Sequence, residues 1–405
     1  MLCLTALAVI QIGYSRHSDA RQAVLDGIRP LLDHRPSLVL AFCGGKLDPD
    51  TVLSTLRREL GEVPVVGGAA AGGIARRGFG YSGLELVLIG FSGDVTPTAL
   101  VQDMLSGEIS AGAALGAQVA AVASEGAAVL LLFDSVASRM PLRLHPASHI
   151  AEGFHRGLGS RSVTLFGGGL LTDMNLSDSW VFDGAALRRH TAVALVFPPG
   201  IAVETAILHG CRPISTFMEI TRIDGAEVYE LDGQPALGVI ERMLGLRLGE
   251  AQGQELSLLA TLGQKQGDPF APYDENCYVN RLILRASPDT GSVTLFEPDF
   301  FPGAKVQIMA RDNALMLDSA RNGVAAMNRM MQGRDNLLAL YIDCAGRASA
   351  RSGALTEEAE VVLNGLTDSV PFAGFYSGVE VAPFQGYSLP LDWTGVLAVL
   401  RRQDR

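Results

Sequence analysis

The sequence predicts an α/β fold: a layered sheet of repeated strand–helix–strand units with glycine turns, followed by a mixed α+β C-terminal domain with antiparallel hairpins. Apolar runs rich in Val, Leu and Ile alternate with segments of helical periodicity, which is typical of α/β layering. These runs are continuously apolar, as strands buried on both faces are. Shorter β-rich runs with turn residues follow after residue 210 and predict the second part.

The chain begins with the apolar stretch "MLCLTALAVIQIG", which lacks the basic n-region and the A-x-A site of a signal peptide. We therefore expect a first strand rather than a signal peptide. The next segment, "SRHSDARQAVLDGI", predicts a helix capped by Ser18 or Asp19. No stretch of the sequence is long and apolar enough to span a bilayer, so we expect no membrane insertion.

The same order of elements then occurs three times. In the first unit, strands at 37–45 and 63–74 end in glycines and flank a helix at 48–60, opened by Asp48 and Pro49. The other two units follow this order, with strand-like segments at 127–135, 163–173, 190–197, 336–347, 370–381 and 393–400. Three units in one order favour a duplication or a shared architecture. We expect residues 37–45, 63–68, 127–133 and 163–168 to be central strands of one sheet, with the glycine turns near a common edge.

Between the second and third units the pattern changes. "TRIDGAEVYELDGQPAL" contains a D-G turn between strand-like runs, which is a hairpin signal. The segment 278–309 adds "PDTG" and "PG" turns. These turns predict an antiparallel insertion or second domain that begins near residue 210.

Composition limits the kinds of partner. The net charge is -11 with no basic block to offset it, which argues against nucleic acid or an anionic membrane surface and favours a small molecule or a protein. The five cysteines are far apart and form no C-x-x-C pair, so neither a disulfide framework nor a zinc site is indicated. A reducing cytoplasm fits this cysteine usage best.

The stretches "VPVVGGAAAGGI", "VTLFGGGLLTDMNLSDSWVFDG", "HGCRPISTFMEITRIDGAEVYELDGQPAL" and "PFAGFYSGVEVAP" resemble the FIST family over nearly the whole chain. The resemblance implies a FIST N-terminal-like domain at 1–209 and a FIST C-terminal-like domain at 210–405. It also implies a sensory protein that binds a small ligand, with amino acids suggested, next to a signalling protein such as a histidine kinase. Gly68, Ala69, Ala70 and Gly73 stand where relatives tend to have Cys, Ser, Thr and Glu, while Ser377 and Glu380 match the family.

Glycines at strand ends would let backbone N–H groups face an anion, and Arg212 in "HGCRP" could hold a carboxylate. Tight turns and an interdomain ion pair are the structural alternatives. The predicted ligand-binding residues are Gly67, Gly68, Gly167, Gly168, Asp173, His209, Arg212, Gly374, Tyr376, Ser377 and Glu380.

No nucleophile–base pair can be assembled, because "YSG" lacks the G-x-S-x-G frame and no histidine follows Ser377. We therefore expect no enzyme. No metal site is expected, because the sequence around the histidines at 145–155 shows no further ligands, and no cofactor is expected other than a possible haem. Three hypotheses stay open: a non-catalytic cytoplasmic sensor of a small anion such as an amino acid, a hydrolase, and a haem-based nitric oxide sensor reporting to a kinase. The last is implied by the resemblance, and its axial ligand would be His145, His149, His155 or His209. Because Pro146 marks a helix boundary, His145 and His149 are expected not to share a helix face, and all three histidines of this segment are expected to be solvated.

Overall fold

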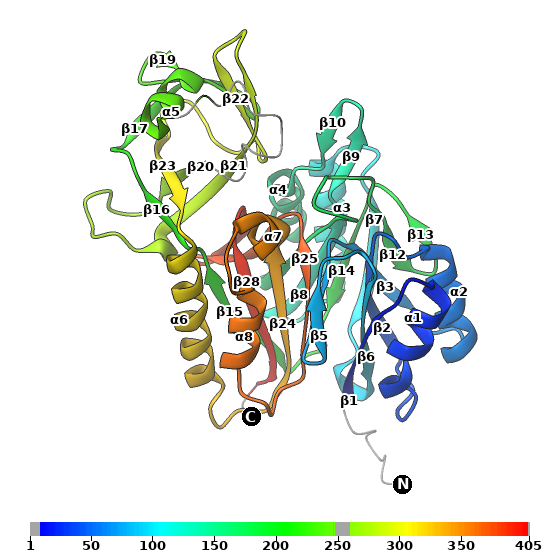
Figure 1. Ribbon diagram of the computed structural model, residues 1–405. Helices are drawn as coiled ribbons and strands as arrows, with labels where there is room; N and C mark the ends of the chain where they lie inside the picture. Colours follow the sequence, from blue (N-terminus) through cyan, green and yellow to red (C-terminus); the bar gives the residue numbers. More distant parts are fainter. Residues whose placement is uncertain (1–8, 246, 248–259, 404–405) are drawn as a thin grey trace.

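The computed structural model describes residues 9–245, 247 and 260–403. A body of three six-stranded sheets lies beside a smaller antiparallel barrel (Figure 1). The predicted α/β class and the antiparallel second part are confirmed. No helix in this described part is long and apolar enough to cross a membrane.

The three sheets of the body share one strand order. The first is β1 (Val9–Arg16), β6 (Glu85–Ser92), β2 (Leu38–Gly44), β3 (Val65–Ala70), β12 (Val181–Gly184) and β13 (Leu187–Arg188). The second is β7 (Thr98–Asp103), β14 (Thr191–Val196), β8 (Ala127–Asp134), β11 (Val163–Leu170), β26 (Glu380–Phe384) and β27 (Tyr387–Leu391). The third is β15 (Ile201–Leu208), β28 (Gly395–Arg402), β24 (Asn336–Cys344), β25 (Phe372–Ser377), β4 (Gly73–Ala75) and β5 (Gly78–Gly80).

Each sheet takes its last two strands from another unit. The hairpin β4–β5 follows β3 along the chain but completes the third sheet, β12–β13 completes the first, and β26–β27 completes the second. The expectation of one common sheet is therefore wrong: β2 and β3 lie in the first sheet, and β8 and β11 in the second. Strands pair in parallel only within a unit, where a helical crossover joins β2 to β3, β8 to β11 and β24 to β25.

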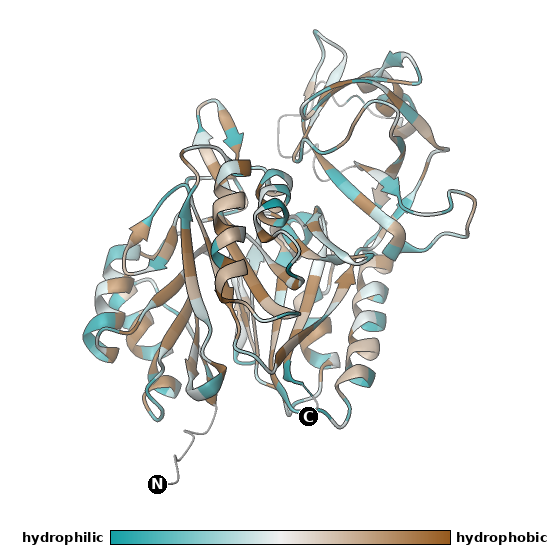
Figure 2. Cartoon of the chain, turned by 180° about the vertical axis from the view of Figure 1, so that it is seen from behind, coloured by the Kyte–Doolittle hydropathy of each residue, from teal (hydrophilic) through white to brown (hydrophobic). Residues whose placement is uncertain are grey.

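Two helices cover the outer face of each sheet: α1 (Ala20–Gly27) and α2 (Pro49–Leu60), α3 (Glu108–Val122) and α4 (Ala147–Leu158), and α6 (Asn313–Met331) and α8 (Glu358–Gly365). The inner faces meet in one core. In β2, for example, Leu40 and Phe42 face this core, while Ala41 and Cys43 pack under the helices. Burial on both faces explains the continuous apolar runs, and Figure 2 shows the apolar strands inside and polar residues on the helix surfaces. Asp19 and Asp48 cap α1 and α2, as predicted.

The barrel is inserted between β15 and α6. It contains β16 (Cys211–Pro213), β17 (Met218–Asp224), β18 (Glu227–Leu231), β19 (Gln234–Pro235), β20 (Ala260–Lys265), β21 (Tyr278–Ser287), β22 (Ser292–Leu295) and β23 (Lys305–Arg311), with α5 (Ala236–Leu244) packed on it. The pairing of β23 with β20 closes it. The predicted D-G and "PDTG" turns join β17 to β18 and β21 to β22. The predicted domain boundary at 209/210 falls between β15 and this barrel, but the second and third sheets contain strands from both sides of it.

Candidate functional site

A cavity of about 290 Å³ lies between the barrel and the body. The body contributes the loop after β11, the end of β24 with the residues that follow it, and the turns after β25 and before β28. The barrel contributes strands β21 and β22 and the residue after β22. The lining residues are Leu142, Leu171, Met174, Asn175, Leu176, Leu282, Leu284, Arg285, Thr294, Phe296, Cys344, Ala345, Gly346, Arg351, Ser377, Gly378 and Trp393.

The loop after β11 is held in shape by polar contacts. Asp173 accepts hydrogen bonds from the backbone N–H groups of Asn175 (2.8 Å) and Ser177 (3.2 Å). Arg351, on the short helix α7 (Ser349–Ser352), donates to the carbonyl oxygen of Met174 at 2.9 Å and to Oδ1 of Asn175 at 3.1 Å. Two segments that are about 175 residues apart in the sequence thus form one wall of the cavity.

The charges on the lining are of one sign. Among the lining residues, Arg285 and Arg351 are cationic and none is a carboxylate. Arg285 is exposed, and its described hydrogen bond is a long one, 3.5 Å to Oγ1 of Thr294. The remaining surface is mainly leucine, phenylalanine, methionine and tryptophan side chains. A largely apolar cavity with two guanidinium groups suits a small amphipathic anion.

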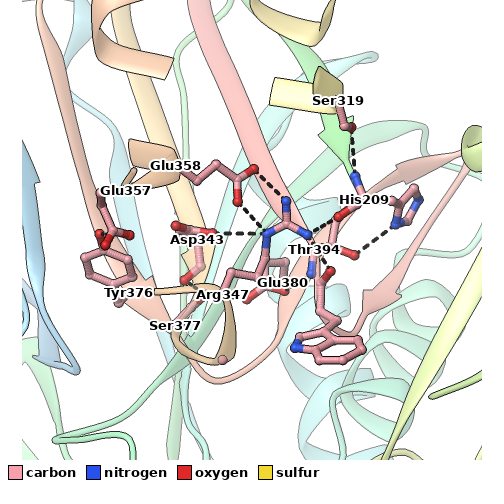
Figure 3. Close-up of polar contacts among 12 residues, drawn as sticks. His209, Ser319, Asp343, Arg347, Glu357, Glu358, Tyr376, Ser377, Glu380 and Thr394 are labelled. Atoms are coloured by element: carbon pink, nitrogen blue, oxygen red, sulfur yellow. Dashed lines mark hydrogen bonds and ion pairs between the residues drawn. The ribbon is translucent and has the colours of Figure 1, made fainter. Parts of the chain in front are cut away.

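Behind the cavity, Arg347 is the centre of a buried polar network (Figure 3). Its Nε lies 2.9 Å from Oε2 of Glu358 and 3.5 Å from Oδ1 of Asp343. Its Nη1 donates to the carbonyl oxygens of His209 and Trp393. Arg347 is 2% exposed, so the guanidinium ties the body's third sheet to the strand end that leads into the barrel without contacting solvent.

Three predicted site residues, at the end of β25 and the start of β26, belong to the same buried region. Oγ of Ser377 lies within hydrogen-bond distance of Oε1 of Glu380 and of the carbonyl oxygen of Asp343, and the hydroxyl of Tyr376 donates to Glu357 at 2.9 Å. Burial raises the pKa of Glu380 well above its usual range, so the neutral acid is favoured there. Of these three, Ser377 lines the cavity, whereas Glu380 and Tyr376 do not.

The junction residues His209 and Arg212 lie apart from the cavity. Burial and the nearby Arg347 lower the pKa of His209 to about 3, so its imidazole is neutral. Its Nδ1 is 3.2 Å from Oγ1 of Thr394. The Arg212 side chain is 60% exposed and lies 3.5 Å from Oδ2 of Asp312. This geometry matches the interdomain ion pair that was the structural alternative for Arg212.

The glycines are not strand-end turns, which corrects the expectation for Gly67, Gly167 and Gly374. They lie inside β3, β11 and β25, each paired with strands on both sides, and Gly68 and Gly168 follow in the same strands. A Cβ at Gly67, Gly167 or Gly374 would come within 2.2, 1.9 or 2.1 Å of the carbonyl oxygen of Ala41, Leu131 or Tyr341, respectively. The reason for glycine is therefore a close approach of neighbouring strands and not an anion cradle.

The histidines do not fit a haem in this cavity, since none lies among its lining residues. The prediction that His145 is solvated is wrong, since its side chain is buried. Its Nδ1 contacts Glu108 and its Nε2 contacts His190. It precedes α4, so it does not share a helix face with His149, as predicted. His155, half-buried on α4, contacts the carbonyl oxygen of Ser388 at 2.8 Å. His209 is 1% exposed and lies behind the cavity.

Of the residues predicted to bind ligand, the cavity lining thus includes Ser377, while Asp173 positions the neighbouring loop. Sequence reasoning missed Arg285, Arg351 and Trp393. A signal for Trp393 was available from the FIST resemblance, because Leu391, Asp392, Trp393 and Thr394 stand where relatives tend to have His, Asn, Gln and Thr. The sequence contained no signal for the two arginines. Each resembles any surface arginine in its local sequence, and only the folded structure brings the barrel next to the loop after β11.

Comparison with known proteins agrees with this architecture. Residues 37–234 match the model of the FIST N domain and residues 236–383 that of the FIST C domain. An uncharacterized protein of Mycobacterium tuberculosis is 28% identical over 203 residues, which is 50% of this chain and 51% of that protein. A Mycobacterium bovis protein, also uncharacterized, is 27% identical over 205 residues, with the same coverage. The chain spans about half the length of the curated relatives that it matches.

Two solved structures align with most of the chain at low similarity. A cyanuric acid hydrolase from A. caulinodans has 9% identity and a TM-score of 0.33, with 98% of this chain and 100% of that chain covered. A chorismatase has 10% identity and a TM-score of 0.36, with 97% and 99% covered. At these TM-scores neither alignment supports a statement about this chain's activity.

Proposed function

Because this chain belongs to the FIST family, whose domains are associated with sensing and signal transduction, we propose that it is a non-catalytic sensor whose small ligand occupies the cavity between barrel and body. The observation that supports this most is the lining itself. Arg285 and Arg351 stand among apolar side chains, and no carboxylate is present among the lining residues.

The ligand is a small organic acid with an apolar body. A guanidinium binds a carboxylate with two parallel hydrogen bonds, and leucine and phenylalanine side chains bury the rest of the molecule. The sequence suggested an amino acid as the anion. Because no lining side chain offers a negative charge to an ammonium group, a carboxylic acid without a free amine fits better than a zwitterion.

Ligand binding would change the contact between barrel and body. Leu282, Arg285 and Phe296 belong to the barrel, whereas Arg351 and Trp393 belong to the body. A ligand that touches both favours the arrangement in which the two walls are close. We propose that a signalling protein such as a histidine kinase responds to this change. The proposed location of the protein is the cytoplasm.

A binding role is favoured over catalysis by the state of the two candidate nucleophiles in the lining. Oγ of Ser377 is already in hydrogen-bond contact with Glu380 and the Asp343 carbonyl, and no imidazole lies among its hydrogen-bond partners. Burial raises the pKa of the Cys344 thiol well above its usual range, which disfavours the thiolate.

A thermal-shift screen of aliphatic and aromatic carboxylates, with amino acids included, tests the proposal. A ligand at about a hundred times its dissociation constant stabilises the folded state by about 2.7 kcal/mol, a shift of several degrees. Arg285→Ala should melt near the wild type without ligand and lose the shift with it. Arg212→Ala, which removes an exposed arginine outside the cavity, is the matched control and should keep the shift.

Two results would contradict the proposal. One is a compound that still raises the melting temperature of Arg285→Ala but no longer raises that of Arg212→Ala. That result would place the anion site at the junction predicted from the sequence. The other is turnover of a screened compound that is abolished by Ser377→Ala, which would make the protein an enzyme.

A further inference from the structure

A second polar cluster lies in the second unit of the body. It is formed by Asp134 at the end of β8, His145 just before α4 and His190 just before β14. One ligand atom from each of these side chains lies within 4.8 Å of the others. Asp134 and His145 are buried and His190 is half-buried, so the cluster is close to solvent on one side.

The two imidazoles face each other. Nε2 of His145 lies 3.0 Å from Nδ1 of His190. Two nitrogens bound to one tetrahedral zinc ion at about 2.0–2.1 Å are about 3.3 Å apart. To bind an ion beside the line that joins them, the nitrogens would separate by a few tenths of an ångström and each ring would turn so that its lone pair points at the ion. Without an ion, one shared proton joins the same two nitrogens.

Hydrogen bonds from the surrounding groups fix the positions of these side chains. Oε1 of Glu108, on α3, lies 2.7 Å from Nδ1 of His145, which places the proton on Nδ1 and leaves the Nε2 lone pair facing His190. Asp134 accepts from the backbone N–H of His190 at 2.7 Å, from the backbone N–H of Val136 at 3.1 Å, and from Oγ of Ser179. These contacts still leave carboxylate lone pairs for an ion.

A small void borders one member of the cluster, His145. A void of about 10 Å³, lined by His145 and Ser135 among others, approaches the volume that one water molecule needs. Oγ of Ser135 is buried and has no hydrogen-bond partner. Asp134 and His190 are not among the residues that line this void, so a fourth ligand would come from solvent on the side of the half-buried His190.

We infer that Asp134, His145 and His190 bind a divalent transition-metal ion, with Zn²⁺ favoured. Two imidazoles and one carboxylate are a donor set that zinc takes with a water as fourth ligand, whereas calcium and magnesium prefer oxygen ligands throughout. Glu108 acts as a positioning residue, because it contacts His145 and not the ion.

Tag-free protein stripped with a chelator and titrated with Co²⁺ tests the inference. We expect one equivalent to bind with the visible absorption of four-coordinate cobalt, and Zn²⁺ to displace it. Binding should be lost in His190→Asn, which keeps a residue that tolerates the backbone φ of 51° at this position. His149→Asn, which removes a histidine outside the cluster, should bind as the wild type does.

A second variant keeps the test decisive if His190→Asn folds poorly. Glu108→Gln leaves all three ligands in place and should weaken Zn²⁺ binding about 10- to 100-fold, the usual effect of removing such a partner. Wild-type protein that takes up no stoichiometric Co²⁺ or Zn²⁺ would overturn the inference. So would equal affinity in the wild type and in His190→Asn.

Discussion

Oε1 of Glu297 accepts a hydrogen bond from the backbone N–H of Ala147 at 3.0 Å, so a carboxyl group that follows a barrel strand caps the first turn of α4 in the body. Its other oxygen accepts from the N–H of Ser148 at 2.8 Å. Arg281 and Asp392 form two further barrel–body contacts, to the carbonyl oxygen of Pro390 and the backbone N–H of Leu282. These buried contacts hold the wall of the cavity that the barrel contributes.

Stability should depend on the protonation of Glu297. Burial, with the charge of Asp392, raises the pKa of Glu297 to about 8 in the folded protein, above its ordinary value of 4.5. A raised carboxyl pKa means that the folded state holds the extra proton, so stability is lost as the pH rises through 8. The pKa of Asp392 is raised to about 6, so its contribution falls below the window between pH 6.5 and 8. Burial also raises the pKa of Glu380, so the contribution of Glu297 is the part of the slope that its own substitution removes.

We therefore expect Glu297→Gln, which resembles the protonated acid, to flatten the fall in melting temperature between pH 6.5 and 8. The control Glu230→Gln, at a carboxylate paired with Arg222 on the barrel, should keep the wild-type slope. Identical slopes in wild type and Glu297→Gln would show that this carboxyl does not titrate in that range.

Arg347 should be among the most sensitive positions for stability. Removing a buried ion-pair partner leaves the other charge uncompensated, so Arg347→Ala should lower the free energy of unfolding by about 3–5 kcal/mol, measured by urea denaturation. Adding Glu358→Ala should cost much less than the sum of the two single changes, because the carboxylate is then no longer unpaired. Additive losses would mean that the two groups do not stabilise each other.

Gly374→Ala should destabilise the third sheet. The added Cβ would lie 2.1 Å from the carbonyl oxygen of Tyr341, so β24 and β25 must separate, at a cost of about 1–3 kcal/mol or more. Gly238→Ala, in α5, meets no atom within 4 Å and should be neutral or slightly stabilising. Wild-type melting of Gly374→Ala would show that this close approach is not required.

The sequence alone determined the elements and much of their order. The strands at 37–45 and 127–135, the helix start at Asp48 and the D-G hairpin depend on periodicity and turn chemistry, which act between residues that are neighbours in the chain. The glycines of β3, β11 and β25 were found in the same way, although their reason was assigned wrongly, because a close approach of two strands cannot be seen within one strand.

Only the tertiary structure decided which sheet each hairpin completes. A short hairpin such as β4–β5 can satisfy its hydrogen bonds at any open sheet edge, so its own residues do not specify that it pairs with β25, about 300 residues later. The cavity, the partners of Arg347 and the meeting of His145 with His190 were likewise decided by the tertiary structure. Each depends on side chains from distant segments, whose distances are fixed by packing rather than by sequence spacing.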